Sequence, residues 1–536
     1  MQFDYIIIGG GSAGCVLANR LTETGQFTVC LLEAGSDAKS FLVNTPGLFA
    51  AHMFTHKFNW AYESKPKADI RQGKSLFVPR GKGLGGSSSI NAMVYIRGQK
   101  QDYDHWAELG NVEWGYDKLL PYFKKAETNE NGACEYHGDD GPLYVSNCDS
   151  QYPLTEVFIE AAQQAGFPYS KDFNAANQEG IGCYQFTIKD GQRCGAAKGY
   201  LMPALERANL TVITQAQASK IVFSGNRAVA VEYERKGKQY RIDARAEIIV
   251  SSGAINSPQL LMLSGIGDKQ HLDKFNIPCI TDLPGVGQNL REHVDACVLV
   301  ASTKKDGFTA NVAGLAKMAP EVLKYLNSRT GKLANSMTES GGFLKSSEQA
   351  ETPDVQYHFV PLLFDDCGRD LKLMSNHGYS LHVCVLRPES TGSICLASGD
   401  IQEPPVIDFN FFSDAGGKDK QVLIDGIRQA RKILSSPAFE SYRGIELHPG
   451  IEVQEDEDIF SKAKETLGLV YHPSGTCKMG DDPLAVVDQN LKVHGTLGLR
   501  VVDGSVMPTL ISGNTNAPII AIAEKAACMI LSCVEH

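Results

Sequence analysis

The chain opens with apolar positions whose period switches from that of a strand to that of a helix. Residues 5–8 are apolar and end in three glycines, after which apolar residues recur at helical spacing over residues 13–21. A second strand pattern at residues 28–32 ends at Glu33. This order of strand, tight turn, helix and strand predicts a right-handed βαβ unit with parallel strands.

The later pattern divides the chain into two styles. Residues 300–460 show Gly and Pro breaks between short alternating runs, which is typical of an antiparallel sheet. The last part of the chain returns to the first style and predicts a helix after Pro518. We expect further strands at residues 220–223, 228–234, 247–250, 380–386 and 499–502. The pattern predicts an α/β protein, α+β overall, in which a Rossmann-type domain is interleaved with an antiparallel one.

Composition narrows the class of protein. The 51 Lys and Arg residues against 62 Asp and Glu residues give the 536-residue chain a net charge of −11, and the sequence contains no basic stripe that suits a nucleic acid. We therefore expect no nucleic-acid partner. The 14 cysteines lack CxxC pairs and the spacing of a zinc site, so we expect no metal and thiols that fit a reducing compartment.

Hydropathy bears on where the protein resides. The first residues run directly into a strand without the basic and apolar regions of a signal peptide, which favours a cytoplasmic protein. The sequence contains no run of about 18 uncharged apolar residues, as a membrane span requires. Residues 315–326 hold spaced apolar positions that suit a lid, a helix in peripheral contact with the inner membrane surface, or an ordinary amphipathic surface helix.

Gly9, Gly11 and Gly14 fit the G-x-G-x-x-G fingerprint of a dinucleotide site. The spacing allows a tight turn, close approach of the backbone to a pyrophosphate, and close packing of the helix on the strand. Glu33 follows Gly14 by nineteen residues, where an acidic side chain accepts hydrogen bonds from ribose hydroxyls. The fingerprint alone does not distinguish FAD from NAD, so a nicotinamide dehydrogenase stays open at this point.

Longer motifs carry a resemblance to one family. A segment rich in Gly and Ser ends at Asn91, a Gly-Ala-Ile-Asn-Ser-Pro segment begins an apolar helix, and a Tyr-His-Pro-Ser-Gly segment precedes a Gly-Asn-Thr-Asn loop. These motifs occupy residues 81–91, 253–267, 283–290, 471–480, 501–505 and 513–518. In this order, and over essentially the whole chain, the sequence resembles the glucose-methanol-choline (GMC) oxidoreductases. It looks closest to bacterial FAD-dependent alcohol dehydrogenases of the aliphatic alcohol and choline dehydrogenase-like branch.

The resemblance implies two interleaved domains. The FAD-binding domain is expected to comprise residues 1–155, 196–300 and 463–536, the last of which carries the catalytic residues. The substrate domain is expected to comprise residues 156–195 and 301–462.

The resemblance also implies roles for individual residues. His472 stands at the family's catalytic position, where a histidine serves as the base for the alcohol proton. Asn514 stands at the second active-site position, which is His or Asn in the family, and its amide suits a developing alkoxide. Ile90 stands where members that bind FAD covalently have His, so non-covalent FAD is expected. The expected cofactor-binding residues are Gly9, Gly11, Ser12, Gly14, Glu33, Gly85, Ser87, Asn91, Ala92, Val94, Ile221, Asp503, Asn514 and Thr515.

The function that the resemblance implies is oxidation of a primary alcohol, aliphatic or aromatic, to the aldehyde. Hydride would pass to the flavin N5 with His472 as base, and the electrons would pass to a quinone or another non-oxygen acceptor. An alcohol oxidase of the same family, which uses oxygen and releases hydrogen peroxide as hydroxymethylfurfural oxidases do, stays open. A lyase or a non-redox protein on the same fold is a further alternative, because one fold hosts several functions.

Overall fold

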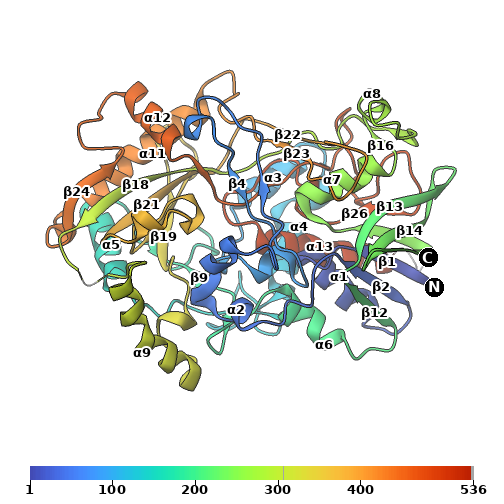
Figure 1. Ribbon diagram of the computed structural model, residues 1–536, viewed down its shortest axis with the longest axis horizontal. Helices are drawn as coiled ribbons and strands as arrows, with labels where there is room; N and C mark the ends of the chain where they lie inside the picture. The colour runs from blue at the N-terminus through green and yellow to red at the C-terminus, as the bar shows by residue number, and fades with distance from the viewer. Residues whose placement is uncertain (306, 533–536) are drawn as a thin grey trace.

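Two sheets organise the protein, and the computed structural model describes residues 1–305 and 307–532 of it (Figure 1). Within this described part, each of the two sheets has seven strands. The first sheet lies at the end of the molecule where the chain starts, and the second lies at the opposite end (Figure 1). The chain passes repeatedly between them, so the predicted interleaving of a Rossmann-type half with an antiparallel half is confirmed.

The first sheet is built on the parallel strands that the opening pattern predicted. β1 (Gln2–Ile8) lies between β2 (Val29–Glu33) and the C-terminal half of β15 (Lys238–Val250), and both pairings are parallel. α1 (Ser12–Thr22) connects β1 to β2, which confirms the predicted βαβ unit. The sheet is completed by β12 (Leu210–Thr214), β13 (Gln217–Ser224), β14 (Arg227–Arg235) and β26 (Leu499–Val501).

β15 is much longer than the four residues, 247–250, that the apolar pattern predicted. Residues 238–241 are exposed, because this half of the strand pairs with β14 in a hairpin and has no core to face. The buried run appears where β15 enters the sheet beside β1. An apolar pattern therefore marked the buried end of the strand and missed the rest.

The helix expected after Pro518 is α13 (Asn516–Ser532), which packs against α1. It begins two residues before Pro518, and proline is tolerated there because the first-turn amides have no partner within the helix. Arg20 of α1 binds the buried Glu524 of α13, with 2.7 Å between Nη2 and Oε1. Further helices are α3 (Lys100–Glu108), α4 (Tyr116–Ala126), α7 (Gly253–Leu263) and α12 (Asp456–Glu465).

The second sheet is antiparallel along the order β24-β18-β21-β20-β19-β8, with the short β25 beside β18. Its strands are β8 (Gly180–Cys183), β18 (Val294–Ser302), β19 (Ser340–Leu344), β20 (Val355–Val360), β21 (Gly378–Val385), β24 (Arg443–His448) and β25 (Gly468–Leu469). The expected domain boundary at residue 300 falls inside β18. The sequence shows no change of pattern there, because the apolar strand runs through residue 300 without a Gly or Pro break.

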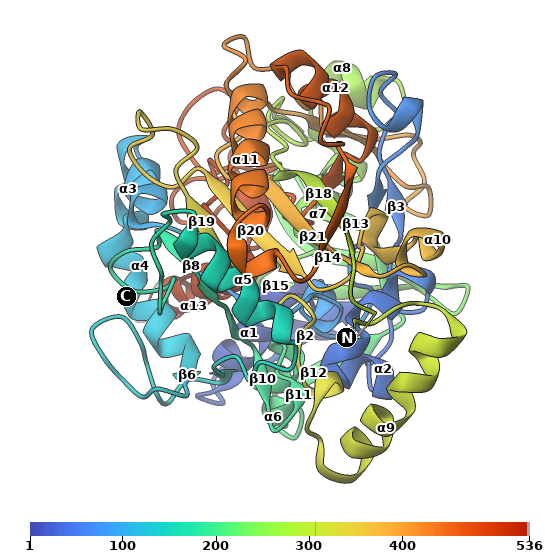
Figure 2. The same ribbon diagram turned by 90° about the vertical axis from the view of Figure 1, so that its left-hand side faces the viewer.

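The two faces of the second sheet have different partners. α11 (Lys418–Leu434) and α5 (Pro153–Gln164) lie over the outer face (Figure 2), where Phe158 and Phe359 stack with ring centroids 4.7 Å apart. Alternate residues of each strand point to the inner face. There His358 of β20 lies opposite His382 of β21, so the register gathers polar side chains on the side that faces the first sheet.

α9 (Val312–Ser328) covers the stretch 315–326, and it projects from the body of the molecule at the lower left of Figure 1. Among the residues that the structure describes, no helix combines the length and the apolar character needed to cross a membrane.

Candidate active site

A cavity of about 350 Å³ lies between the two sheets, within the size range of small-molecule sites. Its walls come from the ends of β1 and β2, the Gly- and Ser-rich loop, the inner face of the second sheet, and the loops after β25 and β26. Many expected site residues line it. They are Gly9, Gly11, Ser12, Glu33, Ser87, Asn91, Ala92, Val94, His472, Asp503, Asn514 and Thr515.

Two of the expected glycines lie outside the lining and pack against the loops instead. A Cβ on Gly14 would lie 1.9 Å from the carbonyl oxygen of Gly9, so α1 can approach β1 this closely only with glycine there. A Cβ on Gly85 would lie 2.2 Å from Ser89 Oγ. These residues shape the cavity from behind its surface.

Ile221 also lies outside the cavity, and residues 216–218 line it instead. The Ile221 side chain is buried and its N–H donates to Ser264 Oγ at 2.8 Å. The structure therefore places residues 216–218, and not Ile221, at the cavity wall. The apolar pattern of β13 fixes which residues are buried but not which residue reaches the cavity.

The glycine turn and the start of α1 form one end of the cavity. Gly9 has a φ of +103°, which side chains rarely adopt, and Gly11 is the N-cap residue of α1. Because glycine has no side chain to cap the helix, the first-turn amides stay available for an anion such as a phosphate. The residues present at this end fit the pyrophosphate of a dinucleotide.

Two carboxylates border this end and already accept hydrogen bonds from the backbone. Glu33 accepts from the N–H groups of Gly10 at 2.8 Å and Gly35 at 2.7 Å, so it holds the glycine turn as well as lining the cavity. Burial raises the pKa of Glu33, although these amides favour its charged form. Asp503 accepts from the N–H of Gly253 at 2.8 Å and so joins the start of α7 to the cavity wall.

Arg193 holds the loop of the Gly- and Ser-rich motif and was not expected from the sequence. Its Nη1 donates to the side-chain oxygen of Asn91 at 2.6 Å and to the carbonyl oxygen of Asn91 at 2.7 Å. Burial lowers the pKa of Arg193 to about 9. A single arginine on a short strand outside any motif gave no signal by which the sequence could assign this role.

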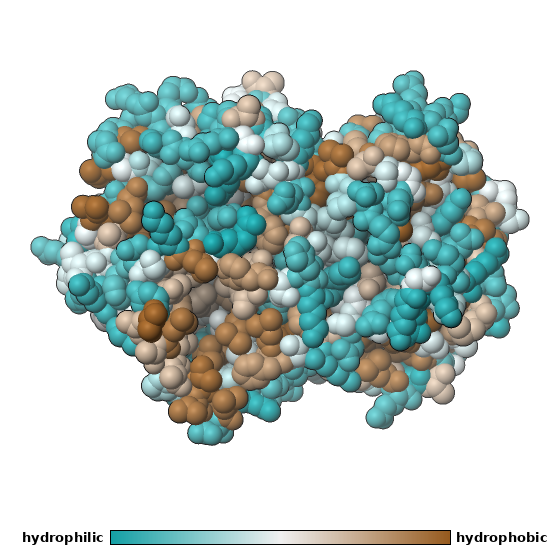
Figure 3. All heavy atoms as spheres, viewed as in Figure 1, coloured by the Kyte–Doolittle hydropathy of each residue, from teal (hydrophilic) through white to brown (hydrophobic). Residues whose placement is uncertain are grey.

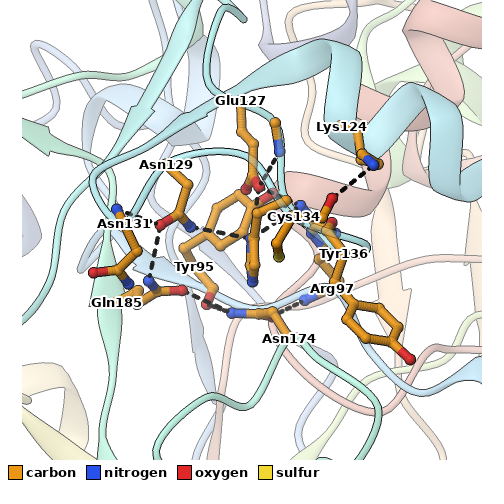
Figure 4. Close-up of polar contacts among 12 residues, drawn as sticks. Tyr95, Arg97, Lys124, Glu127, Asn129, Asn131, Cys134, Tyr136, Asn174 and Gln185 are labelled. Carbon is orange, nitrogen blue, oxygen red and sulfur yellow. Dashed lines mark hydrogen bonds and ion pairs between the residues drawn. The ribbon is translucent and has the colours of Figure 1, made fainter.

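A buried polar network anchors the residues that follow Val94 of the cavity wall (Figure 4). The guanidinium of Arg97 lies 2.6 Å from the carboxylate of Glu127, which also lies 2.6 Å from His137 Nδ1. Asn174 accepts from the N–H of Arg97 at 2.9 Å. The network ties this wall to the segment that follows α4 and to the segment before β8, because its members come from all three.

The candidate base, His472, belongs to a chain of directed hydrogen bonds. His293 Nε2 lies 3.0 Å from the carbonyl oxygen of Leu386, and that oxygen can only accept, so Nε2 carries the proton of the neutral ring. His293 Nδ1 then accepts from His472 Nδ1 at 2.9 Å. The lone pair of His472 is consequently on Nε2, which lies 3.2 Å from Asn514 Nδ2 at the cavity. This arrangement presents a proton acceptor to a ligand.

The two histidines favour their neutral forms. The pKa of His472 lies well below the usual histidine value, first because the ring is buried and then because positive charge on His293, His358 or Arg80 opposes its own. Burial lowers the pKa of His293 to about 4. Near neutral pH both rings can therefore hold the tautomers that the hydrogen bonds assign.

Gln356 of β20 orients the amide of Asn514 and was not expected from the sequence. Its Nε2 donates to Asn514 Oδ1 at 3.1 Å, so Asn514 turns its NH₂ group toward His472. Gln356 lies in the part of the chain where motifs are few, and only strand alternation placed it on the inner face. Alternation gives the face of a side chain but not its partner.

Glu292 fixes the backbone of both histidines. Its Oε1 accepts from the N–H of His472 at 2.7 Å and from the N–H of His293 at 3.0 Å. Burial raises the pKa of Glu292 to about 8, against the opposing effect of these amides and of Arg80. Glu292 lies two residues after the motif at 283–290, to which the sequence assigned no role at the base.

The wall that extends from His472 over the second sheet carries charges in balanced pairs. Asp295 Oδ2 lies 2.8 Å from His382 Nδ1, and Asp365 Oδ1 lies 2.7 Å from Arg71 Nη2. Burial alone would lower the pKa of His382, but Asp295 and Asp365 outweigh burial and raise it. The apolar residues beside these pairs are Phe49, Met53, Phe77, Val360, Phe364 and Leu469. A wall of this kind suits an uncharged ligand better than an ion.

Fold and cavity define a class of protein. A Rossmann-type half with a glycine turn at the start of its first helix is joined to an antiparallel half, and a histidine and an asparagine meet where the two halves face each other. This is the architecture of a nucleotide-cofactor oxidoreductase with a separate substrate wall.

The sequence model of the GMC oxidoreductase family matches residues 3–295 and 388–523, and the chain belongs to this family. It is 42% identical to an alcohol dehydrogenase [acceptor] of Pseudomonas putida over 100% of this chain and 96% of that protein. It is 43% identical to an oxygen-dependent choline dehydrogenase of Pseudomonas fluorescens over 98% of this chain and 93% of that protein. Among solved structures, pyridoxine 4-oxidase from Mesorbium loti matches with a TM-score of 0.89, at 28% identity over 99% of both chains.

Proposed function

We propose that the protein oxidises an uncharged primary alcohol, aliphatic or aromatic, to the aldehyde, with non-covalently bound FAD and with His472 as base. The observation that carries the proposal is the lone pair of His472 Nε2, which meets the amide of Asn514 at the cavity. The names of the relatives support the reaction class, since an alcohol dehydrogenase and choline dehydrogenases are among them.

The residues around the cavity fit FAD. The glycine turn and the start of α1 suit its pyrophosphate, and the loop that Arg193 holds supplies Ser87, Asn91 and Val94 to the same cavity. Ile90 is buried at the cavity and offers no nucleophile, which supports non-covalent binding. When bound, FAD would supply the acceptor for the hydride that leaves the alcohol carbon.

The chain's own residues manage the proton. His472 Nε2 accepts the proton of the alcohol hydroxyl. His293 Nδ1 accepts a hydrogen bond from the Nδ1–H group of the resulting imidazolium. The amide of Asn514 donates to the alcohol oxygen as negative charge develops on it, and Gln356 keeps this donor oriented. The apolar residues of the second sheet's wall exclude water from the substrate carbon.

The balanced charges of the wall favour an uncharged substrate. Each of the carboxylates Asp295 and Asp365 already has a cationic partner, so a cationic alcohol would find no free anion at these positions. We propose a quinone or another non-oxygen compound as electron acceptor, in line with the name of the Pseudomonas putida relative. The alternative is an alcohol oxidase, which the names of the oxygen-dependent relative and of pyridoxine 4-oxidase support.

The test is anaerobic mixing of the purified protein, loaded with FAD, with butanol, benzyl alcohol or choline, followed by admission of air. We expect the two uncharged alcohols to bleach the flavin faster than choline does, and a soluble quinone to restore the colour faster than air. Rapid recovery with stoichiometric peroxide would instead make the protein an oxidase. Unbleached flavin with every alcohol would contradict the proposed substrate class.

A variant pair separates the base from the fold. His472→Gln should keep bound FAD but slow bleaching by roughly 100-fold or more, because the proton acceptor is lost. His105→Gln replaces an exposed histidine on α3 and should leave the rate unchanged. Equal rates in the two variants would remove His472 from the mechanism.

A further inference from the structure

α9 presents its apolar stripe to solvent. The exposed fractions are 86% for Val312, 61% for Leu315, 62% for Leu323 and 60% for Leu326. At about 100° per residue these four positions fall within an arc of about 80° on one side of the helix. The buried residues of α9, Gly314 and Tyr325, lie on the other side. A surface helix normally turns its apolar stripe toward the core, so the orientation of α9 is inverted.

A further exposed apolar side chain lies beside the inner side of α9. The ring of Phe41 lies 6.0 Å from that of Tyr325, and 54% of Phe41 is exposed. Figure 3 shows hydrophobic side chains gathered on the face where Figure 1 places α9. We define the α9 patch as Val312, Leu315, Leu323 and Leu326. Contiguous exposed apolar surface of this kind marks a site of interaction.

The chain around the patch is cationic although the protein as a whole is anionic. Residues 301–335 contain six basic and two acidic residues, a net charge of +4, whereas the whole chain carries −11 and the remainder therefore −15. Lys317 and Lys324 lie on α9 itself, on the side of the helix away from the apolar stripe. A helix with an apolar stripe on one side and lysines on its polar side has the character of one that lies in the interface of an anionic membrane.

The patch is also connected to the cavity. The short helix at Pro46–Phe54 packs Leu48 against the inner side of α9, in the cluster that contains Tyr325. Two residues of the same short helix, Phe49 and Met53, line the cavity. A surface seated on the α9 patch would therefore lie next to elements that form the substrate wall.

We propose that the α9 patch docks the protein onto the surface of an anionic lipid bilayer, with α9 lying in the interface. This goes beyond the oxidation proposed above and does not depend on it. A bilayer complements both the apolar stripe and the positive charge. A second copy of the chain would bring the same positive charge against the patch and repel it.

The experiment is co-sedimentation of the full-length protein with sucrose-loaded vesicles, made either of phosphatidylcholine alone or of phosphatidylcholine with phosphatidylglycerol. We expect binding to the vesicles with phosphatidylglycerol to exceed binding to phosphatidylcholine by about tenfold in low salt, and to weaken as salt screens the lysines. Leu315→Gln with Leu323→Gln should lower binding by about tenfold, because two apolar anchors leave the interface. Both positions are exposed, so the fold tolerates the change.

Leu484→Gln with Leu497→Gln provides the matched control, because it removes the same side chains from exposed positions on the C-terminal segment. The control should bind vesicles like the unchanged protein. Failure of the unchanged protein to bind vesicles with phosphatidylglycerol, or equal binding by both double variants, would overturn the proposal. A dimer that the α9 variant alone converts to a monomer would also overturn it and assign the patch to self-association. Binding is measured without turnover, so failure of the proposed oxidation leaves this test intact.

Discussion

A single main-chain oxygen, that of Leu386, determines which ring nitrogen of the candidate base carries the proton. Because it can only accept, it fixes the proton of His293 on Nε2, and His293 in turn fixes the proton of His472 on Nδ1. Asn514 then meets an unprotonated Nε2. The motif around His472 identified the base, whereas its tautomer depends on a histidine and a carbonyl from distant segments.

His293 should therefore act as a positioning residue. His293→Gln should slow flavin bleaching by about tenfold, because an amide can rotate and no longer enforces one tautomer of His472. Burial is the main reason for the low pKa of His472 and is unchanged, but loss of the opposing charge of His293 should raise that pKa. Since the neutral ring is the active form, the acid limb of the rate should move to higher pH.

The measurement is the rate of anaerobic bleaching by butanol over a range of pH. His494→Gln is the control, because this half-buried histidine hydrogen-bonds to the carbonyl oxygen of Gly480 outside the cavity lining. A slower rate with an unmoved acid limb would indicate a general loss of structure. An unchanged rate would show that His293 has no role in positioning.

At the scale of elements, strand register decides which charges meet on the substrate wall. β18, β21 and β20 are neighbours, and their register brings Asp295 of β18 next to His382 and Cys384 of β21. Side chains on one face of an antiparallel pair approach closely enough for a carboxylate to neutralise a histidine. The neutralisation of Asp295 is thus a property of two neighbouring strands together.

Removing the cation should change the preferred charge of the substrate. His382→Gln leaves the carboxylate of Asp295 without its ion-pair partner. The kcat/KM for choline, divided by the kcat/KM for butanol, should therefore rise by about tenfold. His382→Gln with Asp295→Asn removes both charges and should return the ratio to that of the unchanged protein. If the single and double variants share one ratio, the pair does not select substrate charge.

The sequence predicted the elements that have strong apolar or glycine patterns, but it did not predict the register of the strands. The glycine spacing predicted β1, α1 and β2, because a buried parallel unit needs apolar strands and a glycine turn. Motifs also gave His472 and Asn514. Gln356 and Arg193 were missed because each is a single polar residue whose partner lies far away in the chain. Local patterns report burial, whereas such pairs arise only from tertiary packing.

At the scale of the whole molecule, buried charges join the two halves and make stability depend on pH. Arg97, Glu127, His137 and Asp172 form one ion-pair network between the wall of the cavity and the segment before β8. Burial alone would lower the pKa of His137, but its hydrogen bonds to Asp172 and Glu127 raise it to about 9. Arg97 and then His137 lower the pKa of Glu127 in spite of burial, and His137 lowers the pKa of Asp172 in the same way.

The sign of the pH dependence follows from these shifts. The pKa of His137 is higher in the folded state than the unfolded value of about 6.5, so its stabilising effect is fully present below that pH and is lost as pH rises through about 9. We expect the urea midpoint of the unchanged protein to exceed that of His137→Gln most at pH 6 and to approach it by pH 10. For the carboxylates the sign is opposite, and their contribution is lost in acid, below about pH 4. A gap between the two midpoints that stays constant from pH 6 to pH 10 would show that His137 is neutral in the folded protein and contributes by packing alone.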